Sequence, residues 1–293
     1  STRVVASTLV SSNHRILNGR RFSTLFIDEA AQALEAACWI AIRKADRVIF
    51  AGDHCQLPPT IKCIEAARGG LDHTLMEKVV ANKPISVSLL KVQYRMNESI
   101  MRFPSEWFYN NQLESAPEIR QRGILDFDTP MIWIDTSEME CHEEFVGESF
   151  GRINKPEANL LLQELESYIQ KIGENRVLDE QIDFGLISPY KAQVQYLRNK
   201  IKSNSFFRRF RPLITVNTVD GFQGQERDVI FISLVRANES GQIGFLNDLR
   251  RMNVAITRAR MKLVILGNAT TLTKHTFYHK LMEYIQKETA IRL

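Results

Sequence analysis

The sequence has 293 residues, of which 44% are hydrophobic and 25% are charged, as in an ordinary globular protein with one large domain or two smaller ones. Its formal net charge of +4 is too small for a broad surface that binds polyanions, so any contact with nucleic acid has to come from a local groove. The four cysteines form no CxxC pair, and no apolar run approaches about 18 residues. These features exclude a disulfide scaffold and a membrane-spanning protein. They predict a soluble intracellular protein, cytoplasmic or nuclear, with no membrane partner.

The first part of the chain is expected to alternate strands with helices. Residues 2–10 are expected to form a strand that ends in a small polar loop around Ser7 and Thr8. Residues 23–27 and 48–51 have the pattern of strands buried on both faces of a parallel sheet, with an apolar-spaced helix between them.

Two adjacent carboxylates, Asp28 and Glu29, directly follow the first of these buried strands. The carboxyl end of a strand is where open α/β sheets bind their ligands. Such a pair can hold Mg²⁺ on phosphates and take the proton of an attacking water. An ordinary strand end that leads into a helix cap has the same local pattern, so the pair alone leaves both interpretations open.

A second polar segment, Gly52-Asp53-His-Cys-Gln56-Leu-Pro-Pro, follows the strand at 48–51. The Gln56 amide both donates and accepts, so it can contact a terminal phosphate, and the alternative is a turn with an internally bonded glutamine. Breaks at 69–70 and 82–84 interrupt the next helix, and we take the second as the domain boundary. The expected domains are therefore residues 1–85 and 86–293.

The second domain is expected to continue the alternation of strands and helices. Strands are expected at 87–92, 131–134, 184–187, 213–216, 229–234 and 262–266, and helices around 100–108, 156–172, 191–202, 246–259 and 274–288. This order predicts an α/β fold in which parallel sheets are flanked by helices.

Two arginines, Arg95 and Arg258, are candidates for stabilising a transferred phosphoryl group. A guanidinium offers planar, paired donors that match phosphate oxygens, and such a finger accelerates phosphoryl transfer by ~10³ to 10⁵. Arg258 is expected on a helix, on the same face as Val254. A surface arginine is the alternative for each.

Three other polar segments have a functional and an ordinary interpretation. Tyr94 can stack on a purine or belong to the core. The turn at 216–226 has two glycines three residues apart and a Thr218 hydroxyl. It can approach and bind a phosphate, or it can be an ordinary polar turn. The basic segment 208–211 with its neighbouring phenylalanines can bind a single strand of nucleic acid, or it can be an ordinary exposed basic segment. The pair His275 and His279 is expected to be a solvated helix face rather than a metal site.

Taken in order, six motifs resemble those of superfamily 1 helicases: FIDEAAQ, GDHCQLPP, VQYRMN, ISPYKAQ, VNTVDGFQGQERD and NVAITRAR. The resemblance is to the branch that includes the RNA helicase of nonsense-mediated decay, the immunoglobulin-mu-binding helicase and senataxin. It extends from Ser7 to Asn268. It implies two RecA-like domains of the P-loop NTPase type, with ATP in the cleft between them and a single strand of DNA or RNA across both.

The resemblance also implies roles for individual residues. Asp28 would hold Mg²⁺ through water, Glu29 would activate the attacking water, and Gln56 would sense the γ-phosphate. Second-domain residues would complete the nucleotide site, with Tyr94 against adenine, Arg95 and Arg258 as fingers, and Gly224 and Glu226 near the ribose or phosphates. The strand would be contacted mostly along its sugar-phosphate backbone by Ser7, Thr8, Pro189, Tyr190, Thr218 and Val219.

One departure from the family pattern is the phosphate-binding loop, G-x-x-x-x-G-K-[ST], because no Gly-Lys dipeptide occurs in the 293 residues. The chain also begins with Ser1 rather than Met. We therefore expect the rear part of a first motor domain and a complete second one, from a monomeric 5′-to-3′ motor with additional upstream domains. Alone, this chain is expected to bind ATP weakly and not to hydrolyse it.

Two other function classes fit these motifs less well than a motor. A non-catalytic nucleic-acid clamp would keep the fold, but it would not need Asp28, Glu29, Gln56, Arg95 and Arg258 together. A P-loop kinase or simple GTPase would need neither a second domain with arginine fingers nor a strand-binding loop.

Overall fold

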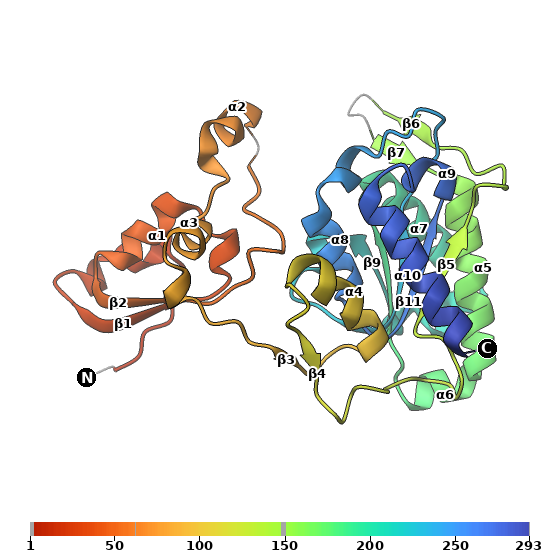
Figure 1. Cartoon of the computed structure of the whole chain (residues 1–293), viewed down its shortest axis with the longest axis horizontal. Helices are drawn as coiled ribbons and strands as arrows, with labels where there is room; N and C mark the ends of the chain where they lie inside the picture. The colour runs from red at the N-terminus through yellow and green to blue at the C-terminus, as the bar shows by residue number, and fades with distance from the viewer. Residues whose placement is uncertain (1–2, 62, 148–150, 293) are drawn as a thin grey trace. The chain divides into compact units, whose positions relative to one another are not determined.

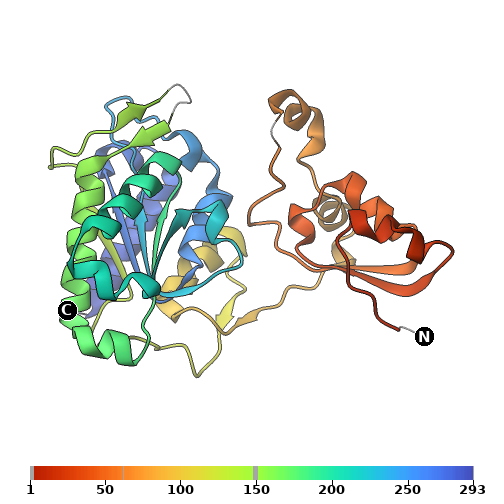
Figure 2. The ribbon, with the colours of Figure 1, turned by 180° about the vertical axis from the view of Figure 1, so that it is seen from behind.

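The computed structural model describes residues 3–61, 63–147 and 151–292 (Figures 1 and 2). The chain divides into two compact units, Ser1–Leu89 and Leu90–Leu293. Within the described residues, no helix combines the length and apolar character required to cross a membrane.

The first unit is a two-stranded parallel sheet with helices packed on one face. Strand β1 (Phe22–Ile27) pairs with β2 (Ala45–Phe50), and α1 (Glu35–Ile42) connects them. Short helical segments lie before the sheet, at its exit and after β2, and they are η1 (Val10–Asn13), η2 (Arg15–Leu17), η3 (Ala30–Gln32), α2 (Ile64–Ala66), the π-helical η4 (Ala67–Leu71), α3 (Leu75–Asn82) and η5 (Pro84–Ser86). The core is formed by Ile27, Ala30 and Cys38 with partly buried neighbours such as Leu25 and Met76.

The expectation that β1 and β2 are buried on both faces is wrong. Phe26 is 69% exposed, and its register partner Ile49 is also exposed, whereas Leu25 and Val48 pack against the core. Side chains alternate across a strand, so one face of this sheet is covered and the other is open in the described part of the chain.

The expected strand at 2–10 is also wrong for its described residues, 3–10. No strand forms there, and the chain turns into η1. The Thr8 hydroxyl accepts a hydrogen bond from the Ser11 amide at 3.2 Å and donates one to the Ser11 hydroxyl at 2.8 Å. Such local side-chain bonds compete with a sheet ladder.

The second unit is built on a five-stranded parallel sheet in the order β5-β11-β10-β8-β9. The strands are β5 (Met131–Asp135), β8 (Phe184–Ser188), β9 (Ile214–Thr218), β10 (Arg227–Ser233) and β11 (Ala259–Gly267). One face is covered by α5 (Lys155–Ile172) and α7 (Lys191–Ser203), and the other by α4 (Glu98–Phe108), α8 (Leu249–Ile256) and α10 (Thr276–Arg292) (Figures 1 and 2). The predicted α/β fold with a parallel sheet between helices is confirmed.

Smaller elements surround this sheet. They are β3 (Val92–Gln93) parallel to β4 (Glu114–Ser115), the antiparallel pair β6 (Glu144–Val146) and β7 (Gly151–Ile153), α6 (Glu174–Asp179), α9 (Ala269–Leu272), and the 3₁₀ turns η6 (Phe206–Arg209), η7 (Arg211–Leu213), η8 (Asp220–Phe222) and η9 (Gly244–Asn247).

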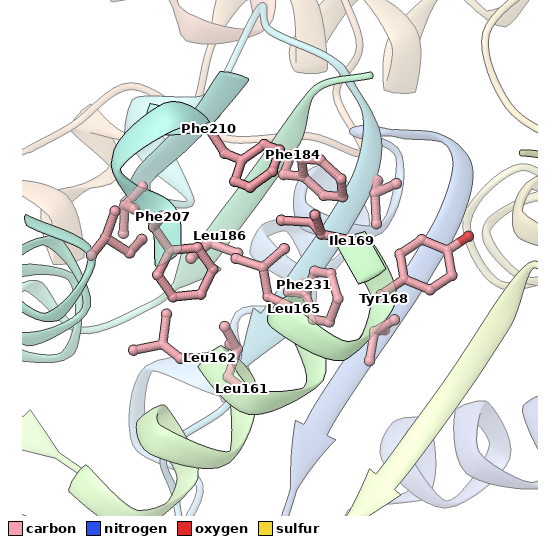
Figure 3. Packing of buried hydrophobic residues seen from close by; sticks show 14 of the residues in the cluster. Leu161, Leu162, Leu165, Tyr168, Ile169, Phe184, Leu186, Phe207, Phe210 and Phe231 are labelled. Atoms are coloured by element: carbon pink, nitrogen blue, oxygen red, sulfur yellow. The ribbon is translucent and has the colours of Figure 1, made fainter. Parts of the chain in front are cut away.

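The main core lies between α5, α7 and the sheet. Figure 3 shows α5 side chains pointing toward β8 and β10, and the fully buried residues there include Leu161, Leu165, Ile169, Phe184, Leu186 and Phe231. Burial of each such side chain contributes about 1.5–3 kcal/mol to folding. Phe207 and Phe210 are also fully buried in this core and the partly buried Phe206 packs against it, so these rings anchor the segment 206–211 to the fold. The rings of Phe207 and Phe210 therefore do not form the exposed aromatic part of a strand-binding patch.

Two predicted elements in the second unit are shorter than expected. The strand at 87–92 is limited to Val92–Gln93, and the helix at 246–259 is limited to α8. Asp248 caps α8 at its start, and β11 begins at Ala259 because Ala259 pairs with Arg227 of β10. Tertiary pairing therefore overrides the helical pattern at this point, and Arg258 lies in a turn rather than on a helix.

A buried polar network ties the start of α5 to the carboxyl end of β10. Glu157 is fully buried, and its Oε1 accepts hydrogen bonds from the Ser233 hydroxyl at 2.5 Å and the Val235 amide at 2.8 Å. Gln193 of α7 donates to the same Ser233 hydroxyl at 2.9 Å. Burial raises the pKa of Glu157 from 4.5 to about 7, although the Ser233 and Val235 bonds lower it.

The free energy of unfolding of the second unit is compared between the Glu157→Gln variant and the native protein. We expect this difference to favour the variant more at pH 8 than at pH 5. A carboxyl with a raised pKa in the folded state contributes stability below pH 4.5, and this contribution is lost as pH rises through about 7. The difference in unfolding free energy between the variant and the native protein should change by about 2–3 kcal/mol across this window. Urea unfolding at both pH values measures it, with the partly exposed Glu164→Gln as the control on the same helix. An unchanged difference would contradict the assignment.

Candidate functional site

In the first unit, Asp28 and Glu29 lie at the carboxyl end of β1, beside the exit of β2. The Ala51 amide donates to the Ile27 carbonyl at 2.8 Å, and the Ala30 amide donates to the Ala51 carbonyl at 2.9 Å, which joins the two exits. Both carboxylates are exposed, and Asp28 Oδ1 accepts from the Glu29 amide at 2.9 Å. Glu29 has a left-handed φ of 50°, an uncommon conformation that turns the chain sharply after the strand.

The turn after β2 places Asp53 and Gln56 next to this pair. A Cβ atom added to Gly52 would lie 3.0 Å from the Ala30 nitrogen, so the two turns are in close contact and only glycine fits without a shift. The Gln56 side chain donates to Asp53 Oδ2 at 2.7 Å. Mg²⁺ in nucleotide sites is usually held by one or two carboxylates together with waters and phosphate oxygens, so the carboxylates at this edge fit a magnesium ion on a phosphate.

In the second unit, Glu226 lies between two arginines. Arg95 Nε and Arg260 Nε both donate to its carboxylate, the latter at 2.9 Å, and Arg260 also pairs with Asp228 at 3.2 Å. Glu226 and Asp228 lie at the amino end of β10 and Arg260 at the amino end of β11. Burial raises the pKa of Glu226, but the bonds from Arg95 and Arg260 outweigh this and hold it below its usual value, so the carboxylate stays ionised.

Arg258 belongs to the same edge but is enclosed by its own unit. The side chain is 3% exposed, and it donates to the carbonyls of Val254 and Gln225 at 3.1 and 3.2 Å. Arg95 Nη1 donates to the Thr257 carbonyl at 3.1 Å, and Arg258 Nη2 donates to the Thr257 hydroxyl at 3.1 Å. The structure therefore brings together Arg95, Arg258 and Glu226, whereas the side chain of Tyr94 is exposed to solvent.

Two of the loops expected to contact a single strand of nucleic acid, those that follow β8 and β9, lie at the opposite edge of this sheet. Ser188 is the register partner of Thr218, so the turns that follow β8 and β9 are neighbours at the carboxyl edge. Tyr190 is 4% exposed, and Val219 is also buried, which leaves the partly exposed Pro189 and Thr218 as the accessible side chains among the four. The other two candidates, Ser7 and Thr8, are exposed in the first unit.

Residues 219–226 cross the sheet from one edge to the other. They run from the end of β9 to the start of β10, with the buried Phe222 packed over β8, where a Cβ atom on Gly185 would lie 2.9 Å from the ring. A Cβ atom on Gly221 would lie 2.4 Å from the side chain of Asn217, so this glycine serves internal packing. Gly224 has a left-handed φ of 74° and is exposed.

Three contributors to the arginine cluster, Arg260, Asp228 and Thr257, were missed by the sequence interpretation. Their signal was present, because all three lie inside the motifs that contain Glu226 and Arg258. Only the parallel pairing of β10 with β11 brings the starts of the two strands side by side.

A protein-family model described as an AAA domain matches residues 71–270, and a second model with the same description matches residues 1–63. The chain is 36% identical to an uncharacterized ATP-dependent helicase of Methanocaldococcus jannaschii over 96% of this chain and 41% of that protein. It is 34% identical to DNA-binding protein SMUBP-2 of Mesocricetus auratus, over 95% of this chain and 28% of that protein. It is 36% identical to the regulator of nonsense transcripts 1 homolog of Drosophila melanogaster, over 96% of this chain and 24% of that protein. The chain therefore spans less than half the length of each of these relatives.

Gly52→Ala should loosen the carboxyl edge of the first unit, because the added methyl meets the backbone at Ala30. We expect a loss of about 1–3 kcal/mol in local stability, read as faster hydrogen–deuterium exchange in β1 and β2. The control is Gly69→Ala, since a Cβ atom there meets nothing within 4 Å. Equal exchange in the two variants would show that the turns are not in contact.

Arg95 and Glu226 should be coupled energetically. We expect a double-mutant cycle with Arg95→Ala and Glu226→Ala, measured by urea unfolding, to give a favourable coupling of about 1 kcal/mol that weakens with added salt. Both side chains are about one-third exposed, which limits the value. The exposed i,i+4 pair Arg176–Glu180 is the comparison, with about 0.3–0.5 kcal/mol expected. A coupling free energy of zero would contradict the ion pair between Arg95 and Glu226.

Proposed function

Because this chain belongs to the AAA domain family, within the superfamily 1 helicase branch of the nonsense-mediated-decay and immunoglobulin-mu-binding helicases, we propose that it is part of an ATP-dependent motor on single-stranded DNA or RNA. The observation that carries the proposal is the sorting of chemistry between the two units. The first gathers carboxylates and a glutamine at one sheet edge, and the second gathers arginines at one sheet edge.

In the proposed mechanism, the first unit prepares the attacking water. Bound Mg²⁺ would neutralise charge on the β- and γ-phosphates. Asp28 would hold the ion, and Glu29 would take the proton of the attacking water. Gln56 contacts the γ-phosphate, and its bond to Asp53 holds the amide in the turn. The exposure of both carboxylates leaves them accessible to a ligand.

The second unit supplies positive charge to the same triphosphate. Arg95 would donate to the phosphate oxygens, Arg258 would do so by giving up its bonds to the Val254 and Gln225 carbonyls, and Tyr94 would stack on the adenine. Gly224 and Glu226 would lie near the ribose or phosphates, and Glu226 would orient Arg95 through their ion pair. Hydrolysis would then require residues of both units. Alternating grip on the strand converts this cycle into steps in the 5′-to-3′ direction.

The motor proposed here requires a phosphate-binding loop from outside these residues. The 293 residues contain no Gly-Lys dipeptide, so the backbone amides and the lysine of such a loop have to come from another part of the protein. The nucleic-acid strand would be contacted by Ser7 and Thr8 in the first unit and by Pro189 and Thr218 in the second. The buried side chains of Tyr190 and Val219 support the turns that carry Pro189 and Thr218. We propose a monomeric intracellular motor, and both DNA and RNA satisfy backbone contacts of this kind.

The proposal is tested in a longer protein that contains residues 1–293 together with an upstream segment carrying a G-x-x-x-x-G-K-[ST] loop. The measured quantity is its ATPase activity in the presence of single-stranded nucleic acid. Glu29→Gln and Arg258→Lys should each lower kcat by at least about 10²- to 10³-fold, because each removes a group that acts in phosphoryl transfer. Arg258→Lys keeps the charge of this enclosed side chain but loses its planar fork. Arg176→Ala, on the exposed surface of α6, should leave kcat unchanged.

Two outcomes would reject this motor. Unchanged turnover in both Glu29→Gln and Arg258→Lys would remove these residues from the chemistry. Tight strand binding with no ATPase activity in the native, loop-joined protein would instead support a non-catalytic clamp.

A further inference from the structure

We propose that Phe245, in η9, is a stacking platform for a base of the single strand that the second unit binds. This inference rests on the proposed function, and it adds a contact to the base where Thr218 and Pro189 reach only the backbone. No motif singled out in the sequence includes Phe245.

The backbone around Phe245 is fixed by its glycine neighbour. Gly244 has a left-handed φ of 57°, and a Cβ atom there would lie 2.3 Å from Arg236 Nη1 and 3.2 Å from the Tyr190 hydroxyl. Arg236 is buried and pairs with Glu143 at 2.7 Å. The 3₁₀ turn that carries Phe245 is therefore pressed against a buried ion pair, so the ring is presented from a rigid base.

The ring of Phe245 packs against two neighbouring side chains and is still largely exposed. Its centroid lies 5.8 Å from that of Tyr190, with 51° between the ring planes, and the Arg251 guanidinium lies 5.9 Å from its centroid. The side chain nevertheless remains 59% exposed. An aromatic ring that is packed against its neighbours and still exposed can stack on a flat partner at little cost in conformational entropy.

The surroundings of Phe245 favour nucleic acid as that partner. Tyr190 joins it to the turn after β8, and the ion pair of Arg251 with Asp220 at 3.8 Å joins it to the turn after β9. The exposed Lys191 follows Tyr190 at the same edge. Stacking rings next to cations that follow a phosphate backbone are the usual combination in proteins that bind single strands.

Fluorescence anisotropy with the 293-residue chain tests this role against two ligands, oligothymidylate of about 15 nucleotides and an abasic oligonucleotide of the same length and charge. The native chain should prefer the base-bearing strand. Phe245→Ala should weaken oligothymidylate binding by roughly 5- to 100-fold and leave abasic binding unchanged, because one base stack is lost. Phe245→Trp should restore the preference. Phe127→Ala is the matched control, since Phe127 is 99% exposed but precedes β5 at the amino edge of the sheet.

Three results would overturn the proposal, and they are distinguishable. If Phe245→Ala retains the native preference for bases, Phe245 does not stack, and the proposed function stands. If Phe245→Ala weakens both ligands equally, its effect is on the fold of the edge and not on a base. If the native chain binds neither oligonucleotide, the strand-binding function itself fails, and this inference fails with it.

Discussion

The bridge from Arg95 through Glu226 to Arg260 is the interaction on which the second unit's proposed chemistry depends. Guanidinium groups gathered at one sheet edge repel each other, and the ionised Glu226 and Asp228 offset that repulsion. Glu226 is itself kept charged by the arginines it holds. The bridge also joins β3 and α4 to the starts of β10 and β11, so it determines where Arg95 points.

The short crossing from β9 to β10 links this edge physically to the carboxyl edge of the sheet. Residues 219–226 begin beside Thr218 and end at Glu226, and Phe222 fixes the middle of the segment over Gly185. A displacement at either end has few ways to be absorbed, because the packed ring and the close approach of Gly221 to Asn217 leave little room. This segment therefore ties the position of one sheet edge to that of the other.

Burial divides the expected strand-contacting residues into two kinds. Tyr190 and Val219 are inside, so their side chains position the turns instead of meeting a ligand. Phe245, which no sequence motif singled out, is held by Tyr190 and remains open to solvent. A residue type alone therefore does not tell which aromatic ring of an edge is support and which is surface.

The sequence by itself determined the alternation of strands and helices, the parallel α/β class and the membership of Asp28, Glu29, Gln56, Arg95 and Arg258 in one set of motifs, because apolar periodicity and local motifs are properties of neighbouring residues. Only the tertiary structure decided that α8 ends before Arg258, that Phe26 is exposed and that Arg260 shares Glu226 with Arg95. These depend on pairing and packing between residues far apart in the chain. Local pattern carries no information about such partners.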